Sequence, residues 1–425
     1  MGSRRIIGAA TVAFAAVVLA ACSSSGGGGG ADSSAPPATG SSGAPAASGS
    51  TWKVGSIASC SGPQASSEGG VCKTTKAWAD SVNAAGGING HKIDLIIKDD
   101  GSNPTTSTSM VHELVEKDHV IAIVGDSSNV DATWASYVQS KGVPVVGGLP
   151  VNTPFITNPN FFGIGTNLLA LNYATILEAK NHGYTKVGFL YCAESPQCAQ
   201  SVPAFEGAAK LLGVKATTAK VAGTAPDYTA QCLQLKSAGV QTYEVGSGSQ
   251  VVLRVLDACR QQGVDAPLIQ TDGTFQNSWT KDKNTEGTLG IELTAPWFDS
   301  SIPAMKEYQD ALQKHAPDVF NSDLYGPNSA YAWISGKLFE AAAKAGNLGD
   351  NPTSQDVFKG LYALKNETLG GLIAPTTYQK VDKGSPSFNT CYFSIQIKDG
   401  KYESLNSSKP TCIDPSKLTP LLPKS

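Results

Sequence analysis

The stretch that decides the fold begins with Trp52-Lys-Val-Gly-Ser-Ile-Ala58 and ends with Ile93-Asp-Leu-Ile-Ile-Lys98. Both runs are short and largely apolar, which is typical of buried strands. Between them, residues from about Glu68 to Ala85 place apolar side chains at helical spacing. A strand, a helix and a second strand predict a parallel βαβ unit, because parallel neighbours need a crossover connection.

The same alternation continues toward the C-terminus. Strands are expected at Val120–Val124 and Val143–Val146, with helices near 105–117 and 130–140. A second series is expected as helix 167–181, strand Lys186–Leu190, helix 199–212, strand 214–221, helix 228–238, strand Thr242–Val245, helix 250–262 and strand Leu268–Gln270. Helices near 302–314, 326–345 and 354–364 and a hairpin turning at Asp399-Gly400 follow.

Two such series predict an α/β fold of two doubly wound, Rossmann-like lobes. The first lobe is expected to comprise residues 51–166 and about 296–377, and the second 167–295 and about 378–425. The chain therefore crosses between the lobes more than once, and these crossings are expected to form a hinge.

The N-terminus is typical of an export signal. Arg4-Arg5 precede an apolar core of about 14 residues, Ile6 to Leu19, which is too short to span a bilayer comfortably. Leu19-Ala-Ala-Cys22 closes the core as a lipobox, so residues 1–22 are interpreted as a lipoprotein signal peptide and Cys22 as the lipid-bearing residue. The alternative is an ordinary signal peptide with an incidental cysteine. Either way, we expect an extracytoplasmic protein, and the lipobox predicts an anchor on the outer face of the cell membrane.

Residues 23–50 are almost wholly Ser, Gly, Ala and Pro, a composition that cannot bury enough apolar surface to fold. They predict a disordered tether with a reach on the order of 30 Å. Loss of Arg4 and Arg5 leaves 30 basic residues against 35 acidic ones, a net charge of −5. This balance argues against nucleic acid as a partner.

Eight cysteines follow Cys22, and an even number in an exported chain indicates disulfides. Closeness in sequence favours the pairs Cys60–Cys72, Cys192–Cys198, Cys232–Cys259 and Cys391–Cys412. Zinc is the competing interpretation, but no C-x2-C pair or neighbouring histidine has ligand spacing. No metal and no cofactor are expected.

Open α/β sheets bind ligands at the carboxyl ends of their strands, where the strand order reverses. In this chain those positions hold small polar residues in both halves, which suit a small polar solute held by hydroxyls, amides and helix N-termini. Helix capping and turn formation explain any one of these residues equally well. The candidate ligand-binding residues are Gln64, Ser67, Ser127, Ser128, Pro150, Val151, Asn152, Tyr191, Gln197, Ser249, Gln250, Asp272 and Gly273.

The chain resembles the leucine/isoleucine/valine-binding family of solute receptors for ABC importers. The resemblance rests on Asn83-Ala-Ala-Gly-Gly-Ile-Asn-Gly-His-Lys-Ile-Asp-Leu95, Lys98-Asp-Asp-Gly-Ser-Asn-Pro104, Ser61-Gly-Pro63, Ile123-Val-Gly125 and Gly142-Val-Pro-Val145. It covers about residues 52–375 and is strongest in the first half. It implies a type I periplasmic-binding-protein fold, a hinged receptor that closes on its solute, and a membrane permease as partner, with the receptor itself expected to be a monomer.

The resemblance also implies roles for particular residues. Backbone N–H groups and hydroxyls of Ser127, Ser128 and Pro150 to Asn152 would meet a ligand α-carboxylate, and Asp272 would meet the ammonium group. The chain departs from the family where amino-acid-binding members often carry aromatic residues, since it has Ser67, Gln197, Ser249 and Gln250 there. Trp134 and Tyr191 could supply an apolar wall of the pocket in place of those aromatic residues, although core packing explains both. Polar amino acids, amides, short peptides and other small organic solutes therefore remain open as ligands.

Enzymatic motifs are weak in this sequence. Gly246-Ser-Gly-Ser lacks the third glycine of a dinucleotide loop, and no Gly-x-Ser-x-Gly or Gly-Lys-Ser/Thr motif occurs. Asp99-Asp100 are interpreted as turn formers and helix caps, and His112 with Glu116 as a solvated pair. A non-enzymatic transport receptor is the expectation, with a sensory module on the same scaffold and a lipid-anchored hydrolase as alternatives.

Overall fold

The computed structural model describes residues 47–193, 196–271 and 273–421, all within one compact unit of the chain. The predicted signal peptide, Cys22 and the tether up to residue 46 lie outside the described residues. Within the described residues, none of the helices combines the length and apolar character that a membrane crossing requires.

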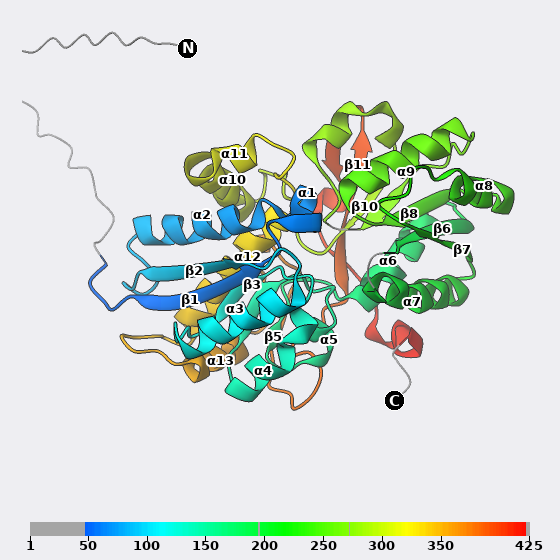
Figure 1. Ribbon diagram of the computed structural model, residues 1–425. Helices are drawn as coiled ribbons and strands as arrows, with labels where there is room; N and C mark the ends of the chain where they lie inside the picture. The colour runs from blue at the N-terminus through cyan, green and yellow to red at the C-terminus, as the bar shows by residue number, and fades with distance from the viewer. Residues whose placement is uncertain (1–46, 194–195, 272, 422–425) are drawn as a thin grey trace, which may run out of the picture. The chain divides into compact units, whose positions relative to one another are not determined.

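A five-stranded parallel sheet forms the centre of the first lobe (Figure 1). Its strands are β1 (Trp52–Ala58), β2 (Ile93–Asp99), β3 (Ile123–Asp126), β4 (Val145–Gly148) and β5 (Phe161–Phe162). They follow the order β2-β1-β3-β4-β5, so the order reverses at β1. The gap between the carboxyl ends of β1 and β3 is therefore where a doubly wound sheet places a ligand.

Helices cover both faces of this sheet. On one face lie α2 (Val71–Ala84) and α12 (Pro327–Ala345), with α10 (Pro303–His315) packed on α2 and α13 (Ser354–Ala363) packed on α12. On the other lie α3 (Pro104–Glu116) and α4 (Ala135–Lys141). Successive residues of the strands belong to two different apolar clusters: Val124 packs with the α2 side and Ile123 with the α3 side. This is the alternation of a strand buried on both faces.

The second lobe contains a mixed sheet. Its strands are β6 (Lys186–Cys192), β7 (Lys215–Val221), β8 (Thr242–Gly246), β9 (Ile269–Thr271), β10 (Leu289–Glu292), β11 (Cys391–Lys398), β12 (Lys401–Ser404) and β13 (Thr411–Cys412). A parallel bridge between Tyr243 and Leu268 joins the β7-β6-β8 part to the β9-β10-β11-β12 part. The predicted hairpin turns at Asp399 and Gly400, both with positive φ, as a tight two-residue turn requires.

Four longer helices pack on this second sheet, and short helical turns connect the elements of both lobes. The longer ones are α6 (Leu168–Asn181), α7 (Pro196–Leu212), α8 (Thr229–Ala238) and α9 (Ser249–Gln261). The short ones are α1 (Ala65–Glu68), α5 (Pro154–Thr157), α11 (Pro317–Phe320), η1 (Gly62–Gln64), η2 (Asp131–Thr133), η3 (Asn277–Lys281), η4 (Lys283–Thr285), η5 (Leu369–Gly371), η6 (Leu405–Ser408), η7 (Pro415–Lys417) and η8 (Thr419–Leu421).

Three stretches of chain run between the two sheets and contact one another. Tyr378 Oη donates to Gly163 O at 2.8 Å, and Ala295 N donates to Leu372 O at 2.8 Å. A Cβ at Gly165 would lie only 2.5 Å from Leu293 O, so this crossing needs a glycine. The chain crosses between the lobes more than once, as predicted for a hinge. The residue bounds of the two lobes stay a prediction.

The predicted helix from Glu68 to Ala85 is wrong in one respect. It is divided into α1 and α2 by Gly69 and Gly70. A Cβ at Gly70 would lie 2.7 Å from Ser329 Oγ of α12, so the chain passes too close to α12 for a larger residue at this break. The structure also contains β5 and β10, which the sequence pattern did not predict.

The eight cysteines form four disulfides, in the pairs that closeness in sequence predicts: Cys60–Cys72, Cys192–Cys198, Cys232–Cys259 and Cys391–Cys412. The first closes the loop that carries α1, and the second closes the loop after β6.

Candidate functional site

A buried polar cluster lies at the carboxyl ends of β1, β2 and β3. Asp100 accepts hydrogen bonds from the hydroxyls of Ser59 and Ser128, and all three residues are buried. Asp100 also accepts from Ser102 N, which confirms its predicted turn role. Its predicted role as a helix cap is wrong, because Asn103 caps α3. Asp100 instead holds the strand-end loops of the first lobe together.

Asn152 and Ser128, two predicted ligand contacts, are joined inside the same lobe. Asn152 Nδ2 donates to Ser128 O and to Asp131 Oδ2, both at 3.0 Å. Both residues are at most 3% exposed. In this structure their side chains support the loops after β3 and β4.

The pKa values of three carboxyl groups in and beside this cluster are raised, which favours their neutral forms. Burial raises the pKa of Glu68 to about 8, although hydrogen bonds from Asn129 oppose the shift. Burial likewise raises the pKa of Asp131 to about 7 and that of Asp126 well above its ordinary range. Glu68 is therefore mostly protonated at neutral pH. Among the described residues no group of His, Cys, Asp and Glu has the arrangement of a metal site.

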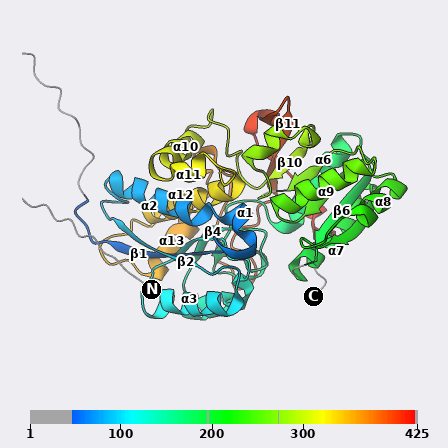
Figure 2. The ribbon, with the colours of Figure 1, turned by 45° about the horizontal axis from the view of Figure 1, so that its top comes forward.

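Helix α1 carries the first strand-end loop into contact with the second lobe, where it packs against α9 (Figure 2). Gln276 Nε2, from the chain after β9, donates to Ser66 O at 2.7 Å. Asn328 Nδ2, at the start of α12, donates to Ser67 O at 3.2 Å and to Gly273 O at 3.3 Å. The structure thus brings two predicted site residues from different lobes, Ser67 and Gly273, onto one amide group.

Ser249 stabilises this contact through a hydrogen bond to Gln276. Its Oγ donates to Gln276 Oε1 at 2.9 Å and accepts from Trp279 Nε1 at 2.8 Å. All three side chains are buried. Ser249 therefore holds the amide of Gln276 in the orientation that reaches Ser66.

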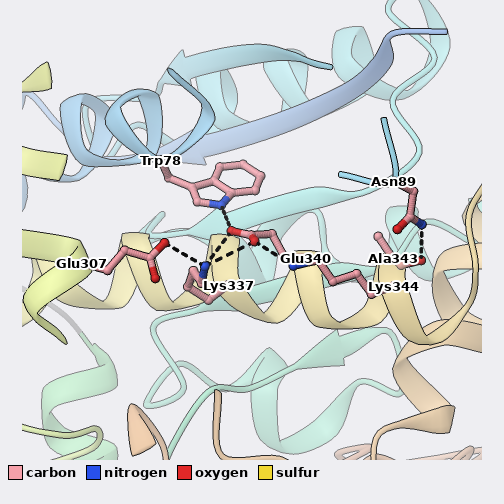
Figure 3. A network of polar contacts seen from close by, with 7 residues as sticks. All are labelled: Trp78, Asn89, Glu307, Lys337, Glu340, Ala343 and Lys344. Atoms are coloured by element: carbon pink, nitrogen blue, oxygen red, sulfur yellow. Dashed lines mark hydrogen bonds and ion pairs between the residues drawn. The ribbon is translucent and has the colours of Figure 1, made fainter. Parts of the chain in front are cut away.

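Helix α12, which carries Asn328, is fixed by charged and polar contacts further along its length (Figure 3). Trp78 Nε1 of α2 donates to Glu340 Oε1 at 3.0 Å. Lys337 lies between Glu340 and Glu307 of α10, at 3.2 and 3.1 Å. A cavity of about 160 Å³ lies beside this network, and a larger one of about 630 Å³ lies along α13. Both are remote from the strand-end loops.

The remaining predicted residues are not shown to join this contact. Tyr191 is half-buried and packs on Phe189, with ring centroids 6.1 Å apart, and Gln250 is exposed on α9. Gln64 in η1 and Val151 after β4 are half-buried, and Pro150 is buried. Asp272 and the side chain of Gln197 lie outside the described residues.

Ser127 and Trp134 have clearer surroundings. Ser127 is buried beside Glu68, whose pKa its hydroxyl lowers. Trp134 is fully buried, stacks on Phe161 at 5.6 Å and donates to Ser107 Oγ at 2.9 Å. Trp134 therefore serves core packing and not a pocket wall.

Sequence reasoning missed Glu68, Gln276 and Asn328. Glu68 directly follows the candidate Ser67, so its position was the available signal. Asn328 is separated from Ser67 by 261 residues, and only the folded topology brings the two together.

Two α/β lobes with contacting crossings and polar strand-end loops define a type I periplasmic-binding-protein fold. The chain belongs to the periplasmic binding protein family, whose profile matches residues 51–401. Among its relatives is a Leu/Ile/Val-binding protein homolog 1 of Brucella suis biovar 1, 26% identical over 375 residues, which cover 83% of this chain and 94% of that protein. An amino acid binding protein of Pseudomonas aeruginosa is 38% identical over 81 residues, 19% of this chain and 20% of that protein.

Solved structures share the fold. A branched chain amino acid ABC transporter protein from Thermus thermophilus with bound valine has a TM-score of 0.74 at 15% identity, covering 88% of this chain and 99% of that one. A fatty acid ABC transporter substrate-binding protein from Thermomonospora curvata has a TM-score of 0.71 at 16% identity, covering 85% and 92%. These two neighbours are named for very different solutes, so the fold alone does not identify a ligand.

Proposed function

We propose that this protein is a lipid-anchored, extracytoplasmic solute-binding protein of an ABC importer. It captures an amino acid or a related small polar solute between its lobes and delivers it to a membrane permease. The observation that carries the proposal is the contact through α1, where one amide group of Asn328 binds the backbone of Ser67 and of Gly273. Strand-end loops of both lobes are thus already within reach of one small solute.

Family membership and the named relatives support the same class of function. The catalytic alternative needs a nucleophile, a base and an orienting group that converge. The hydroxyls of Ser59, Ser128 and Ser249 at these strand ends are hydrogen-bonded to carboxyl, hydroxyl, amide or indole groups, and within the described residues no histidine is among their partners.

Isothermal titration calorimetry of the purified protein against amino acids, amides and short peptides tests the proposal. We expect heat from at least one class of solute and no turnover of it. Mass spectrometry of small molecules that co-purify with the protein extends the search beyond the panel. Turnover of a bound compound, or no bound solute by either method, would contradict a transport receptor.

The anchor is tested separately. We expect radioactive palmitate to label the protein in growing bacteria, and Cys22→Ala to abolish the label. No label on the native protein would exclude the anchor, and labelling that persists in the variant would place the lipid at another residue.

A further inference from the structure

The orientation of the Asn328 side chain is fixed by its partners. Its Nδ2 donates to two backbone carbonyl oxygens, those of Ser67 and Gly273. Carbonyl oxygens only accept, so the nitrogen and not the oxygen of the amide must face them. Oδ1 is therefore the side-chain atom of Asn328 that remains available to accept a further hydrogen bond. The residue is only 7% exposed.

Two polar atoms at this contact have no hydrogen-bond partner among the described residues. They are Asn328 Oδ1 and Ser67 Oγ, and both are buried. Leaving a buried polar atom unpaired costs free energy, so native proteins seldom retain one without a reason. Here two occur on residues that are hydrogen-bonded to each other, at the place where the lobes meet.

The second lobe approaches this pair closely. A Cβ at Gly248 would lie 3.7 Å from Ser67 Oγ, and Gly248 precedes the first turn of α9. The first N–H groups of a helix have no partner within it and suit an oxygen atom. A solute beside Ser67 Oγ therefore has both acceptors and donors near it.

The two arginines that the structure describes are occupied elsewhere. Arg254 donates to Gly223 O and lies over the ring of Tyr228. Arg260 donates to the carbonyl oxygens of Val264 and Asn284. The contact at Ser67 therefore has no guanidinium fork with which to bind a carboxylate.

We propose, on the basis of the proposed function, that Asn328 Oδ1 and Ser67 Oγ select the solute through a hydrogen-bond donor group. The solute then carries an amide, ammonium or hydroxyl group, because Oδ1 accepts and cannot donate. An ionised carboxylate without a donor group is not selected. Asn328 and Ser67 are specificity-determining residues of the site.

Calorimetry with four compounds of similar size tests this inference. Propionamide carries an uncharged amide, alanine an ammonium and a carboxylate, 1-propanol a hydroxyl, and propionate a carboxylate alone. We expect at least one of the three donor compounds to bind and propionate not to bind, and the compound that binds identifies which donor group is used. Binding of propionate as tight as that of the others, or no binding of any donor compound, would overturn the inference, while the wider panel above still decides the proposed function.

Ser67→Ala is the matching variant, because it removes a single oxygen atom that has no hydrogen-bond partner among the described residues. We expect about a tenfold loss of affinity, the effect of one hydrogen bond. Urea unfolding should show no loss of stability, since no protein contact is removed. Ser237→Ala, which changes an exposed side chain on α8, is the control and should bind as the native protein does. Equal affinity of Ser67→Ala and the native protein would refute the role of Ser67.

Discussion

At the scale of single residues, the carboxyl of Glu68 makes stability depend on pH. Burial raises its pKa from 4.5 to about 8. Between these values the unfolded chain has released the proton and the folded protein keeps it. The contribution of Glu68 to stability is therefore fully present below pH 4.5 and is lost as the pH rises toward 8.

We predict that Glu68→Gln weakens this dependence. In the native protein the group lowers the free energy of unfolding by about 1.4 kcal/mol per pH unit between its two pKa values. The variant cannot titrate at this position, so its stability should fall less. Urea unfolding of both proteins at pH 5, 7 and 9 measures the difference.

Asp126 and Asp131 also have raised pKa values, so both proteins retain some pH dependence. The test therefore compares how steeply the free energy of unfolding changes with pH in the native protein and in Glu68→Gln. Glu403→Gln, which changes an exposed carboxyl, serves as the control and should behave as the native protein does. Equal slopes for Glu68→Gln and the native protein would show that Glu68 is not protonated in the folded state.

At the scale of elements, the disulfide Cys60–Cys72 fixes the loop that carries α1. It closes a loop of 12 residues, for which chain entropy predicts a contribution of about 3 kcal/mol. We predict that Cys60→Ser with Cys72→Ser lowers the free energy of unfolding by an amount of this order. Because α1 presents Ser66 and Ser67 to the second lobe, solute affinity should fall as well.

Cys232→Ser with Cys259→Ser is the matched control for this loop. That disulfide joins α8 and α9 over a separation of 27 residues and lies outside the strand-end loops. Its loss should lower stability and leave the affinity of the remaining folded protein unchanged. Unfolding curves and calorimetry on both double variants separate the two effects. Equal affinity losses would mean that the loop around α1 has no special role in binding.

The elements that sequence patterns predict are those long enough to show a period in their apolar residues. β1 and β2 have seven residues each, and α2, which covers most of the predicted helix, has fourteen. β5 has only two residues, which is too short to show a period. Gly70, at the break before α2, approaches Ser329, which is distant in sequence.

For the candidate site, the sequence predicts the location but not the role of each side chain. Polar strand ends follow from the α/β pattern, and Ser67 and Gly273 do lie at the contact between the lobes. Ser128, Asn152 and Ser249 have the same composition and position, but the structure uses their side chains to hold the loops. Sequence alone does not distinguish a hydroxyl that faces a solute from one that faces its own lobe, because both occur at helix starts and turns.

At the scale of the whole molecule, the lobes are joined at two places of different kind. The crossing segments are covalent and packed together, as shown by Gly165 against Leu293. The contact through α1 consists of side-chain amides on backbone carbonyls, such as Gln276 on Ser66. A hinge motion can preserve the first and break the second. We expect the contact through α1 to set how closely the lobes are held together before a solute arrives.

We predict that Gln276→Leu opens the solute-free protein. Leucine cannot donate to Ser66 O, and loss of a part-buried hydrogen bond costs about 0.5–1.5 kcal/mol, enough to shift an open–closed equilibrium roughly two- to 13-fold. Small-angle scattering should show a larger radius of gyration for the variant than for the native protein, and saturating solute should reduce the difference. Gln231→Leu removes an amide that donates to Lys220 O within one lobe and should leave the scattering unchanged. If both variants scatter as the native protein does, the contact through α1 does not hold the lobes together and the hinge is governed by the crossing segments alone.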